Sequence, residues 1–272
     1  MIYLNEQFEE DWKGKDPFTE VEKLDGKVFR SVKMRKTLQF SKFDKSFFVK
    51  IHRGVGWREI FKNFAMLKKP VLGARNEWEA ISKLEELGVD TMKAVAYGET
   101  GKNPAFIHSF IITDDLIDTE SLEDFCRDWV VKPPSLELKN ALIDKLAWVS
   151  RQLHTNGVNH RDYYICHFLL DISKGRENVD PKHIKASLID LHRAQIRTKT
   201  PRRWIVKDVA GLWFSAMDLG LRKRDLYRFM RIYSDKSLKE IFTTEKKFWL
   251  DVNKTAHKLY QKDLRRNQRD NS

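Results

Sequence analysis

Long apolar runs are absent from this chain of 272 residues. No window approaches the roughly eighteen uninterrupted apolar residues that a membrane-spanning helix requires. The N-terminus, MIYLNEQFEEDWKGK, is too acidic and too interrupted for a signal peptide. We therefore expect a cytoplasmic protein.

Cysteine is scarce as well. The chain has two, Cys126 and Cys166, which have neither metal-ligand spacing nor the numbers of a disulfide framework. We expect both to be buried thiols. The sequence also shows no internal repeat and no low-complexity linker.

Positive charge is abundant. Charged residues make up 33% of the chain, and the net charge is +12. Such a surface attracts phosphates, nucleic acid or an anionic bilayer, and charge alone does not choose among them. With 41% hydrophobic residues, 12% of the chain being aromatic, there is enough apolar material for a packed core.

The first half of the chain predicts strands followed by two helices. From Val28 to His52 the pattern indicates a three-stranded antiparallel meander, VFRSV, TLQFSKF and SFFVKIH. In the third strand, alternation places Lys50 on the face opposite to Phe47, Val49 and Ile51. Two helices are then predicted, GWREIFKNFAMLKKP, which ends at Pro70, and ARNEWEAISKLEEL, in which Glu77 shares the inward face of Ile81 and Leu84.

The second half is mostly helical. AVAYGE and AFIHSFIIT predict strands, Ser121 and Asp124 resemble a helix start, and a long amphipathic helix runs from Pro134 to Gly157. Two short strands joined by a polar hairpin come next, and three helical segments close the chain. The predicted class is α+β, with an N-lobe at 1–116 and a C-lobe at 117–272. The strands are HFLLDI and ASLIDL, and the helical segments are KDVAGLWFSAMDLGL, RDLYRFMRIYS and TEKKFWLDVNKTAHKLYQK.

The stretch LHTNGVNHRDYYICHFLL, residues 153–170, is the strongest motif. Its spacing is typical of a protein-kinase-like catalytic loop. In that interpretation Asp162 accepts the proton of the attacking hydroxyl, while His160 and Arg161 support the loop.

Phosphoryl transfer depends on positioning and charge neutralisation. The chain supplies suitable residues in kinase order: Lys50 for the α- and β-phosphates of ATP, Glu77 to orient Lys50, and Asp190 for Mg²⁺. Each has a simpler alternative, namely a solvated lysine, a local salt bridge and a turn cap. Their order and placement together favour the kinase interpretation.

A further aspartate, Asp208, fits a supporting role in which its carboxylate accepts backbone hydrogen bonds from the catalytic loop. An ordinary helix N-cap is the alternative interpretation.

Several features depart from protein kinases. His167 stands where those enzymes have asparagine as a second metal ligand, so we treat it as a candidate ligand beside Asp190. Arg35, Lys36 and Thr37 replace the Gly-rich loop, and we expect these side chains to contact the phosphates of the nucleotide. Asp-Leu-His-Arg replaces Asp-Phe-Gly, and no Ala-Pro-Glu follows, which makes a protein-kinase activation segment doubtful.

These features together resemble the lipopolysaccharide core heptose(I) kinases of Gram-negative bacteria. The resemblance covers nearly the whole chain. It rests on WKGKDPF, KSFFVKIHRG, PVLGARNEWEAI, GVDTMKA, SFIITDDL, SLEDF, GVNHRDYYICHFLL, LIDLHRAQIRTKTPRRW and KDVAGLWFS.

The resemblance implies a two-lobed, protein-kinase-like fold and an ATP- and Mg²⁺-dependent kinase that phosphorylates the first heptose of the inner core. It also implies the roles of Asp162, Asp190 and Lys50 given above, and histidine at position 167 is usual for the family. The implied partners are the lipid-linked inner core and the anionic inner-membrane surface, on its cytoplasmic face, and we expect no nucleic acid.

Two alternative functions stay open: a protein kinase acting on serine, threonine or tyrosine, and a catalytically silent basic module that binds membranes. Two candidate membrane-docking surfaces follow from the basic charge, the segment Trp57 to Lys69 and the final helix around Lys246, Lys254, Lys258 and Arg265. Either one could equally be a core-packed helix with a solvated basic face.

Overall fold

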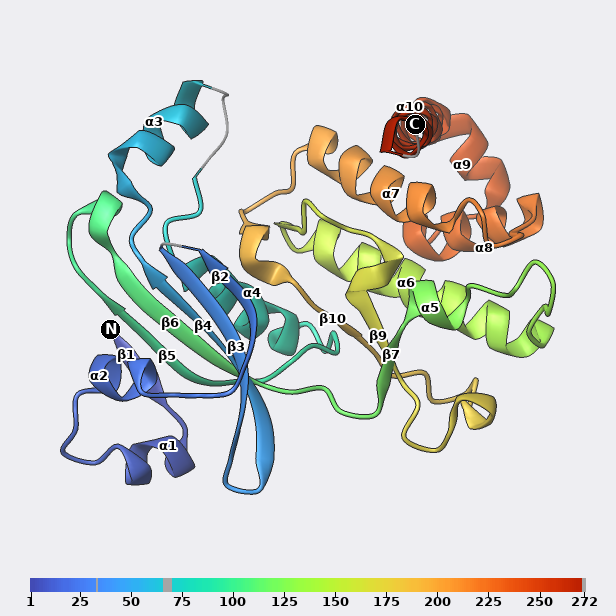
Figure 1. Cartoon of the computed structure of the whole chain (residues 1–272). Coiled ribbons are helices and arrows are strands. Elements are labelled where there is room, and N and C mark those ends of the chain that lie inside the picture. Colours follow the sequence, from blue (N-terminus) through green and yellow to red (C-terminus); the bar gives the residue numbers. More distant parts are fainter. Residues whose placement is uncertain (33, 66–69, 271–272) are drawn as a thin grey trace. The chain divides into compact units, whose positions relative to one another are not determined.

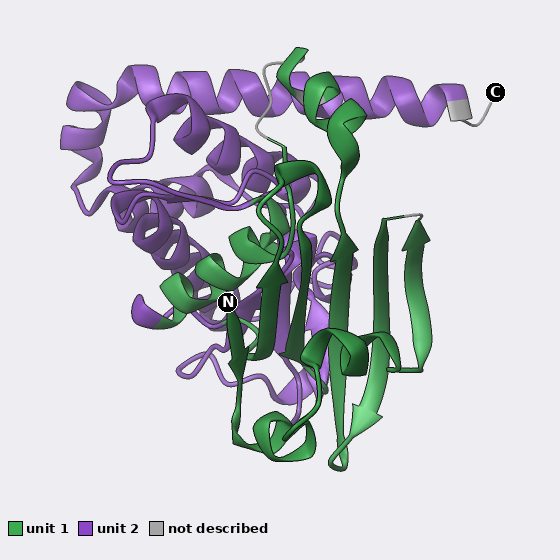
Figure 2. Cartoon of the chain, turned by 90° about the vertical axis from the view of Figure 1, so that its left-hand side faces the viewer, with its two compact units in different colours: residues 1–85, 91–117, 191–193 green, residues 86–90, 118–190, 194–272 purple. Residues whose placement is uncertain are grey.

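The computed structural model describes residues 1–32, 34–65 and 70–270 (Figure 1). It has a mixed architecture with an antiparallel sheet and many helices, and the predicted α+β class is confirmed. The chain divides into two compact units (Figure 2). Unit 1 comprises residues 1–85, 91–117 and 191–193, and unit 2 comprises 86–90, 118–190 and 194–272. The roles assigned above to an N-lobe and a C-lobe stay predictions.

Unit 1 is built on a six-stranded sheet in the order β1-β5-β6-β4-β3-β2, in which every neighbouring pair is antiparallel. The predicted meander forms its β2, β3 and β4, and the predicted basic turn between the first two strands includes residue 33, which lies outside the described residues. The strands are β1 (Ile2–Leu4), β2 (Lys27–Val32), β3 (Arg35–Lys42), β4 (Lys45–Arg53), β5 (Ala94–Thr100) and β6 (His108–Asp114).

Alternation along β4 creates two different faces of this sheet. Phe47, Val49 and Ile51 are fully buried in a core with Phe8 of α1 (Glu6–Asp11), and α2 (Pro17–Glu22) covers the same face. Strand β1 and both short helices had not been predicted from the sequence.

Helices α3 (Gly56–Ala65) and α4 (Arg75–Glu86) follow β4, as predicted. Gly54 precedes the first of them and Gly56 begins it, and both glycines have positive φ angles. Residues 66–69, which the sequence assigned to the end of the first helix, lie outside the described residues. Helix α4 buries Glu77, Ala80, Ile81 and Leu84, so the inward face predicted for it is confirmed.

Unit 2 is mainly helical. The helix start predicted at Ser121 is confirmed, because its hydroxyl accepts from the Asp124 backbone N–H. The last predicted segment, which starts at Thr244, corresponds to the helix that begins at Lys246, whereas the short helix before it had not been predicted. The helices are α5 (Leu122–Phe125), α6 (Leu136–Thr155), α7 (Arg202–Ala216), α8 (Lys223–Ser234), α9 (Leu238–Thr244) and α10 (Lys246–Asp270).

Two small sheets complete unit 2, and one of them carries the predicted polar hairpin. It has the order β10-β9-β7, whereas the other pairs β11 with β8. Short 3₁₀ helices lie in the connections of both units. The strands are β7 (Thr119–Ser121), β8 (Val158–Asn159), β9 (Phe168–Asp171), β10 (Ala186–Leu188) and β11 (Gln195–Ile196), and the 3₁₀ helices are η1 (Pro104–Phe106), η2 (Ile165–His167), η3 (Arg176–Asn178) and η4 (Leu191–Arg193).

The helices of unit 2 pack through apolar faces, α6 against α8 and α7 against α10. Val209, Ala210, Val252 and Ala256 form the core of the second contact. None of the described helices has both the length and the apolar character needed to cross a membrane.

Both cysteines are free thiols. Cys126 is buried, and burial raises the pKa of its thiol well above the ordinary range. Cys166 is partly exposed, and its pKa is raised to about 11, mainly by burial. Neither thiol is therefore activated as a nucleophile.

Gly157 fixes the path from α6 into β8. Its φ angle is +79°, and a Cβ atom added there would lie 1.7 Å from the carbonyl oxygen of Arg197. The backbone N–H of Arg197 also donates to the Gly157 carbonyl at 3.0 Å. Only glycine permits both this backbone angle and this close approach.

Substituting Gly157→Ala should therefore destabilise the protein by about 3 kcal/mol or more, since conformational strain and backbone overlap add. Gly88→Ala is the matched control, because Gly88 also has a positive φ angle, +67°, but open space around the added methyl group. The control should cost only about 1 kcal/mol. Urea unfolding followed by circular dichroism measures both, and equal losses would contradict the packing argument.

Candidate active site

Lys50 on β4 and Glu77 on α4 form an ion pair in unit 1. Lys50 Nζ lies 2.6 Å from Glu77 Oε1, and the Glu77 side chain is only 1% exposed. The second carboxylate oxygen, Oε2, is also buried and has no hydrogen-bond partner among the described residues. A buried carboxylate at this distance fixes the position of the lysine ammonium group.

Strand register decides which of the three phosphate-contact candidates share a face with Lys50. Thr37 is paired with Lys50, and Arg35 is paired with His52, so these side chains project from the same face of the sheet. Lys36 is paired with Ile51 of the core face. The pKa of Glu22 is lowered mainly by its hydrogen bond from Arg53, and the charge of Lys36 makes a smaller contribution in the same direction. The structure brings Arg35 and Thr37, but not Lys36, to the face of Lys50.

His52 is a further residue of this face that the sequence analysis had not proposed for the site. Its side chain is buried, and burial lowers the pKa of the imidazole to about 3, with smaller contributions from the charges of Arg35 and Lys50. His52 is therefore neutral at physiological pH. The alternation of β4 was the available signal, because it placed His52 on the side of Lys50.

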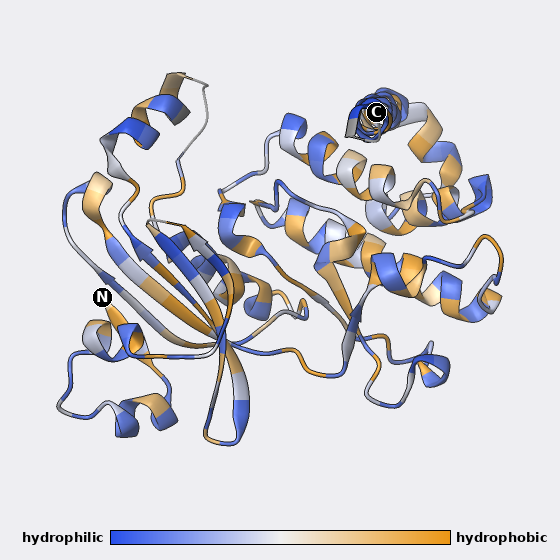
Figure 3. Ribbon diagram, in the orientation of Figure 1, coloured by the Kyte–Doolittle hydropathy of each residue, from blue (hydrophilic) through white to orange (hydrophobic). Residues whose placement is uncertain are grey.

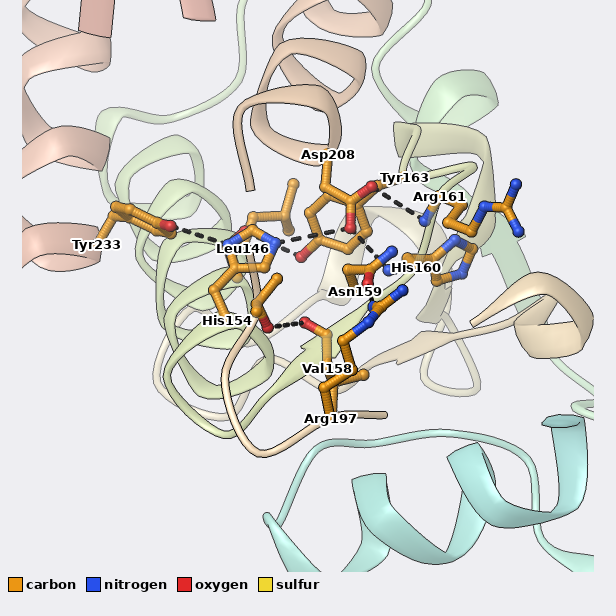
Figure 4. Close-up of polar contacts among 12 residues, drawn as sticks. Leu146, His154, Val158, Asn159, His160, Arg161, Tyr163, Arg197, Asp208 and Tyr233 are labelled. Carbon is orange, nitrogen blue, oxygen red and sulfur yellow. Dashed lines mark hydrogen bonds and ion pairs between the residues drawn. The ribbon is translucent and has the colours of Figure 1, made fainter. Parts of the chain in front are cut away.

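In unit 2, Asp208 holds the loop that carries Asp162. Its Oδ2 accepts from the His160 backbone N–H at 2.6 Å and its Oδ1 from the Arg161 backbone N–H at 2.9 Å (Figure 4). Arg161 has a φ angle of 77°, which is unfavourable for a non-glycine residue. Helix α7 begins at Arg202, so Asp208 lies within the helix and is not its N-cap.

Several side chains, most of them buried, form a connected set of polar contacts around Asp208. His154 Nε2 lies 3.6 Å from Asp208 Oδ2, and His154 Nδ1 lies 2.8 Å from the hydroxyl of Tyr233. Tyr163 lies in the same region (Figure 4), and its hydroxyl is hydrogen-bonded to that of Ser150 at 2.9 Å. The sequence gave no sign that His154 lies close to Asp208, because His154, Asp208 and Tyr233 come from three different helices, α6, α7 and α8.

His160 connects this loop to the segment that precedes Asp190. Burial lowers the pKa of His160, so its imidazole is neutral, and Nε2 lies 2.9 Å from the carbonyl oxygen of Ile189. Because a carbonyl can only accept, Nε2 carries the proton and donates it.

Asp162, His167 and Asp190 lie together in unit 2. His167 Nδ1 is 2.7 Å from the backbone carbonyl oxygen of Asp162, and His167 Nε2 is 3.7 Å from Asp190 Oδ2. The rings of His167 and His160 are stacked, with centroids 5.8 Å apart. Asp190 has a positive φ angle of 61°, so this residue too is held in a strained conformation.

The pair formed by Asp190 and His167 fits a cation. Since the Asp162 carbonyl accepts from Nδ1, a neutral His167 ring directs the lone pair of Nε2 toward the Asp190 carboxylate, and a positive charge between them would relieve the repulsion. Mg²⁺ prefers oxygen ligands and is usually bound by one or two carboxylates together with phosphates and water. Asp190 suits this ion better than His167 does. The described residues contain no group of three or more histidine, cysteine, aspartate or glutamate residues that could hold a metal ion.

A family model and two relatives of known name both match this chain to lipopolysaccharide kinases. Residues 19–233 match the model of the lipopolysaccharide kinase (Kdo/WaaP) family. The lipopolysaccharide core heptose(I) kinase WaaP of Escherichia coli is 48% identical over 267 residues, which are 98% of this chain and 99% of the relative. The enzyme of the same name from Pseudomonas aeruginosa is 49% identical over 264 residues, 97% of each chain.

A solved structure is similar throughout. The structure described as WaaP in complex with acyl carrier protein has a TM-score of 0.84 and 45% sequence identity, and the match covers 96% of this chain and 99% of that one. This likeness confirms the predicted kinase-like class of fold.

The contact between Asp208 and the loop yields a prediction. Asp208→Asn replaces one acceptor oxygen with an amide donor, which cannot accept from a backbone N–H, and should destabilise the protein by about 2 kcal/mol or more. The control is Asp251→Asn, because Asp251 is partly exposed and its carboxylate pairs with the exposed Arg202 at 2.7 Å. It should change stability by less than about 1 kcal/mol. Urea unfolding tests this, and an unchanged midpoint for Asp208→Asn would contradict the support assigned to this carboxylate.

Proposed function

Because this chain belongs to the lipopolysaccharide kinase (Kdo/WaaP) family, we propose that it phosphorylates the first heptose of the lipopolysaccharide inner core with ATP as donor. The observation that carries the proposal is the identity of 48–49%, over nearly the whole chain, with relatives named as heptose(I) kinases. It favours this function over a protein kinase and over a catalytically silent module.

The nucleotide side of the reaction is assigned to unit 1. Lys50, held by Glu77 at 2.6 Å, contacts the α- and β-phosphates of ATP and aligns them. Arg35 and Thr37 project from the same face as Lys50 and are placed to contact phosphate oxygens as well. Lys36 is left out of this set, since it belongs to the opposite face.

The acceptor side is assigned to the loop of unit 2. Asp162 accepts the proton of the heptose hydroxyl as the hydroxyl oxygen bonds to the γ-phosphorus and the bond to the β–γ bridging oxygen of ATP breaks. ADP and a phosphorylated heptose are the products. Asp208 supports this step by holding the loop backbone on both sides of the His160–Arg161 peptide bond.

Asp190, together with His167, is the proposed holder of Mg²⁺. The ion would neutralise the charge of the phosphates during transfer. The arrangement that supports this assignment is the approach of His167 Nε2 to Asp190 Oδ2 at 3.7 Å.

The acceptor is proposed to be the lipid-linked inner core, reached at the cytoplasmic face of the inner membrane. The net charge of +12 supports contact with this anionic surface and offers no base-specific feature that would favour nucleic acid.

A loss-of-function test follows from the role of Asp162. Asp162→Asn keeps the size of the side chain but removes its ability to accept a proton, and it should lower kcat at least about a hundredfold. Asp171→Asn is the control, since Asp171 ends β9, where its carboxylate accepts hydrogen bonds from Ser173 and lies 3.6 Å from Lys185 Nζ. The assay is phosphate transfer from ATP, with Mg²⁺, to heptose-bearing core that lacks phosphate. Retention of near wild-type turnover by Asp162→Asn would refute the assignment of the base.

We also propose that this chain binds an acyl carrier protein and takes up its acyl group. The structural relative described above is a complex with such a protein. Unit 2 contains an apolar cavity of about 510 Å³, which lies within the usual size range of small-molecule sites. Its lining includes Ile143, Leu146, Leu212, Trp213, Phe229 and Trp249.

A larger side chain in the cavity tests the proposed uptake of the acyl group of a carrier protein. Leu226 also lines the cavity, and Leu226→Trp should weaken binding of a long-chain acylated carrier protein about tenfold or more, because less apolar chain can be buried. Leu226→Met, which conserves volume, should bind like the wild type. Titration calorimetry with acylated and unacylated carrier protein measures the effect. Equal affinity for the two forms would exclude uptake of the acyl group.

A further inference from the structure

Helix α3 exposes an aromatic stripe to solvent. The exposed fractions of Trp57, Phe61 and Phe64 are 45%, 63% and 58%, whereas Ile60 is buried and anchors the helix to the rest of unit 1. The three aromatic residues recur at i, i+4 and i+7, so they lie on one face. A helix of this size seldom leaves three large rings uncovered without a partner.

The stripe is ordered and bordered by positive charge. The rings of Trp57 and Phe61 are stacked, with centroids 5.7 Å apart and an interplanar angle of 28°. Arg58 and Lys62 follow these rings in the sequence and are exposed, so each lies next to the stripe on the helix surface. Glu59 opposes Lys62 only weakly, at 3.8 Å between exposed groups. Figure 3 shows the alternation of hydrophilic and hydrophobic residues along α3.

We propose that α3 is a membrane-insertion element, whose aromatic stripe enters the interfacial layer of an anionic bilayer while Arg58 and Lys62 contact lipid phosphates. Tryptophan and phenylalanine on one face with basic residues beside them are typical of helices that lie in a membrane interface. This inference rests on the proposed function, because α3 would supply the membrane contact through which the enzyme reaches a lipid-linked acceptor.

The positive charge of the protein favours an anionic bilayer over a second copy of the chain as the partner of this surface. A second copy of the chain would bring another net charge of +12 and the same two cations to the contact, and like charges oppose such pairing. An anionic membrane is attracted, by about 1 kcal/mol for each basic residue near its surface. The proposal concerns residues 56–65 only, because residues 66–69 lie outside the described part of the chain.

Vesicle binding tests the proposal. We expect the full-length protein to co-sediment with vesicles of phosphatidylethanolamine and phosphatidylglycerol and to bind pure phosphatidylcholine weakly. The double substitution Phe61→Ser and Phe64→Ser should lower the partition coefficient by at least about tenfold. The matched control is Ile117→Ser with Val131→Ser, which removes apolar side chains that are exposed by 69% and 82% and do not belong to α3, and it should leave binding unchanged. Arg58→Gln with Lys62→Gln should reduce the preference for anionic vesicles several-fold.

A parallel assay separates this inference from the proposed function. The α3 variants should phosphorylate a delipidated heptose acceptor as fast as the wild type does, and should lose activity only on acceptor embedded in vesicles. If the wild-type protein phosphorylates the acceptor but does not bind vesicles, only the role of α3 is overturned. If the wild-type protein phosphorylates neither acceptor, the proposed function is refuted. Equal vesicle binding by the α3 and control variants, or self-association that depends on Phe61 and Phe64 in sedimentation velocity, would also overturn the membrane assignment.

Discussion

The contact of the Asp208 carboxylate with two consecutive backbone N–H groups is the interaction on which the candidate catalytic loop depends. It places both oxygens of a buried carboxylate on the loop, at 2.6 and 2.9 Å. The same loop contains a residue, Arg161, with a positive φ angle of 77°. Charge-assisted hydrogen bonds in a buried environment are strong enough to hold such a strained backbone. The backbone that leads into Asp162 is therefore held by Asp208 of α7, a residue more than forty positions further along the chain.

Local patterns in the sequence were sufficient where an element is long and has one buried face. Alternation identified β3 and β4, and helical periodicity identified α4, α6 and α8, because the core selects apolar residues at a regular spacing. The elements that were missed are short or depend on distant partners. Strand β1 is only Ile2–Leu4, and it is stabilised by pairing with β5, whose residues lie more than ninety positions away. No local pattern encodes such a pairing.

In the candidate site too, local patterns placed some residues correctly, whereas contacts between distant segments could not be predicted. Glu77 could be assigned because its spacing from Ile81 and Leu84 placed it on a buried face, and the lysine it would meet lay on the preceding strand. Lys36 was grouped with Arg35 and Thr37 by adjacency, yet neighbouring residues of a strand project to opposite faces. The proximity of His154 to Asp208 was beyond the reach of sequence reasoning, because it depends on how α6 and α7 pack.

His167 links the backbone of Asp162 to Asp190 through its two ring nitrogens. Its Nδ1 must donate to the Asp162 carbonyl, which leaves Nε2 facing Asp190 at 3.7 Å. Nε2 of His167 and the Asp190 carboxylate can both contact a cation held between them. A cation bound there would place positive charge where the proposed phosphoryl transfer requires it. Histidine at this position therefore ties the proposed metal-binding residue to the backbone of the proposed base.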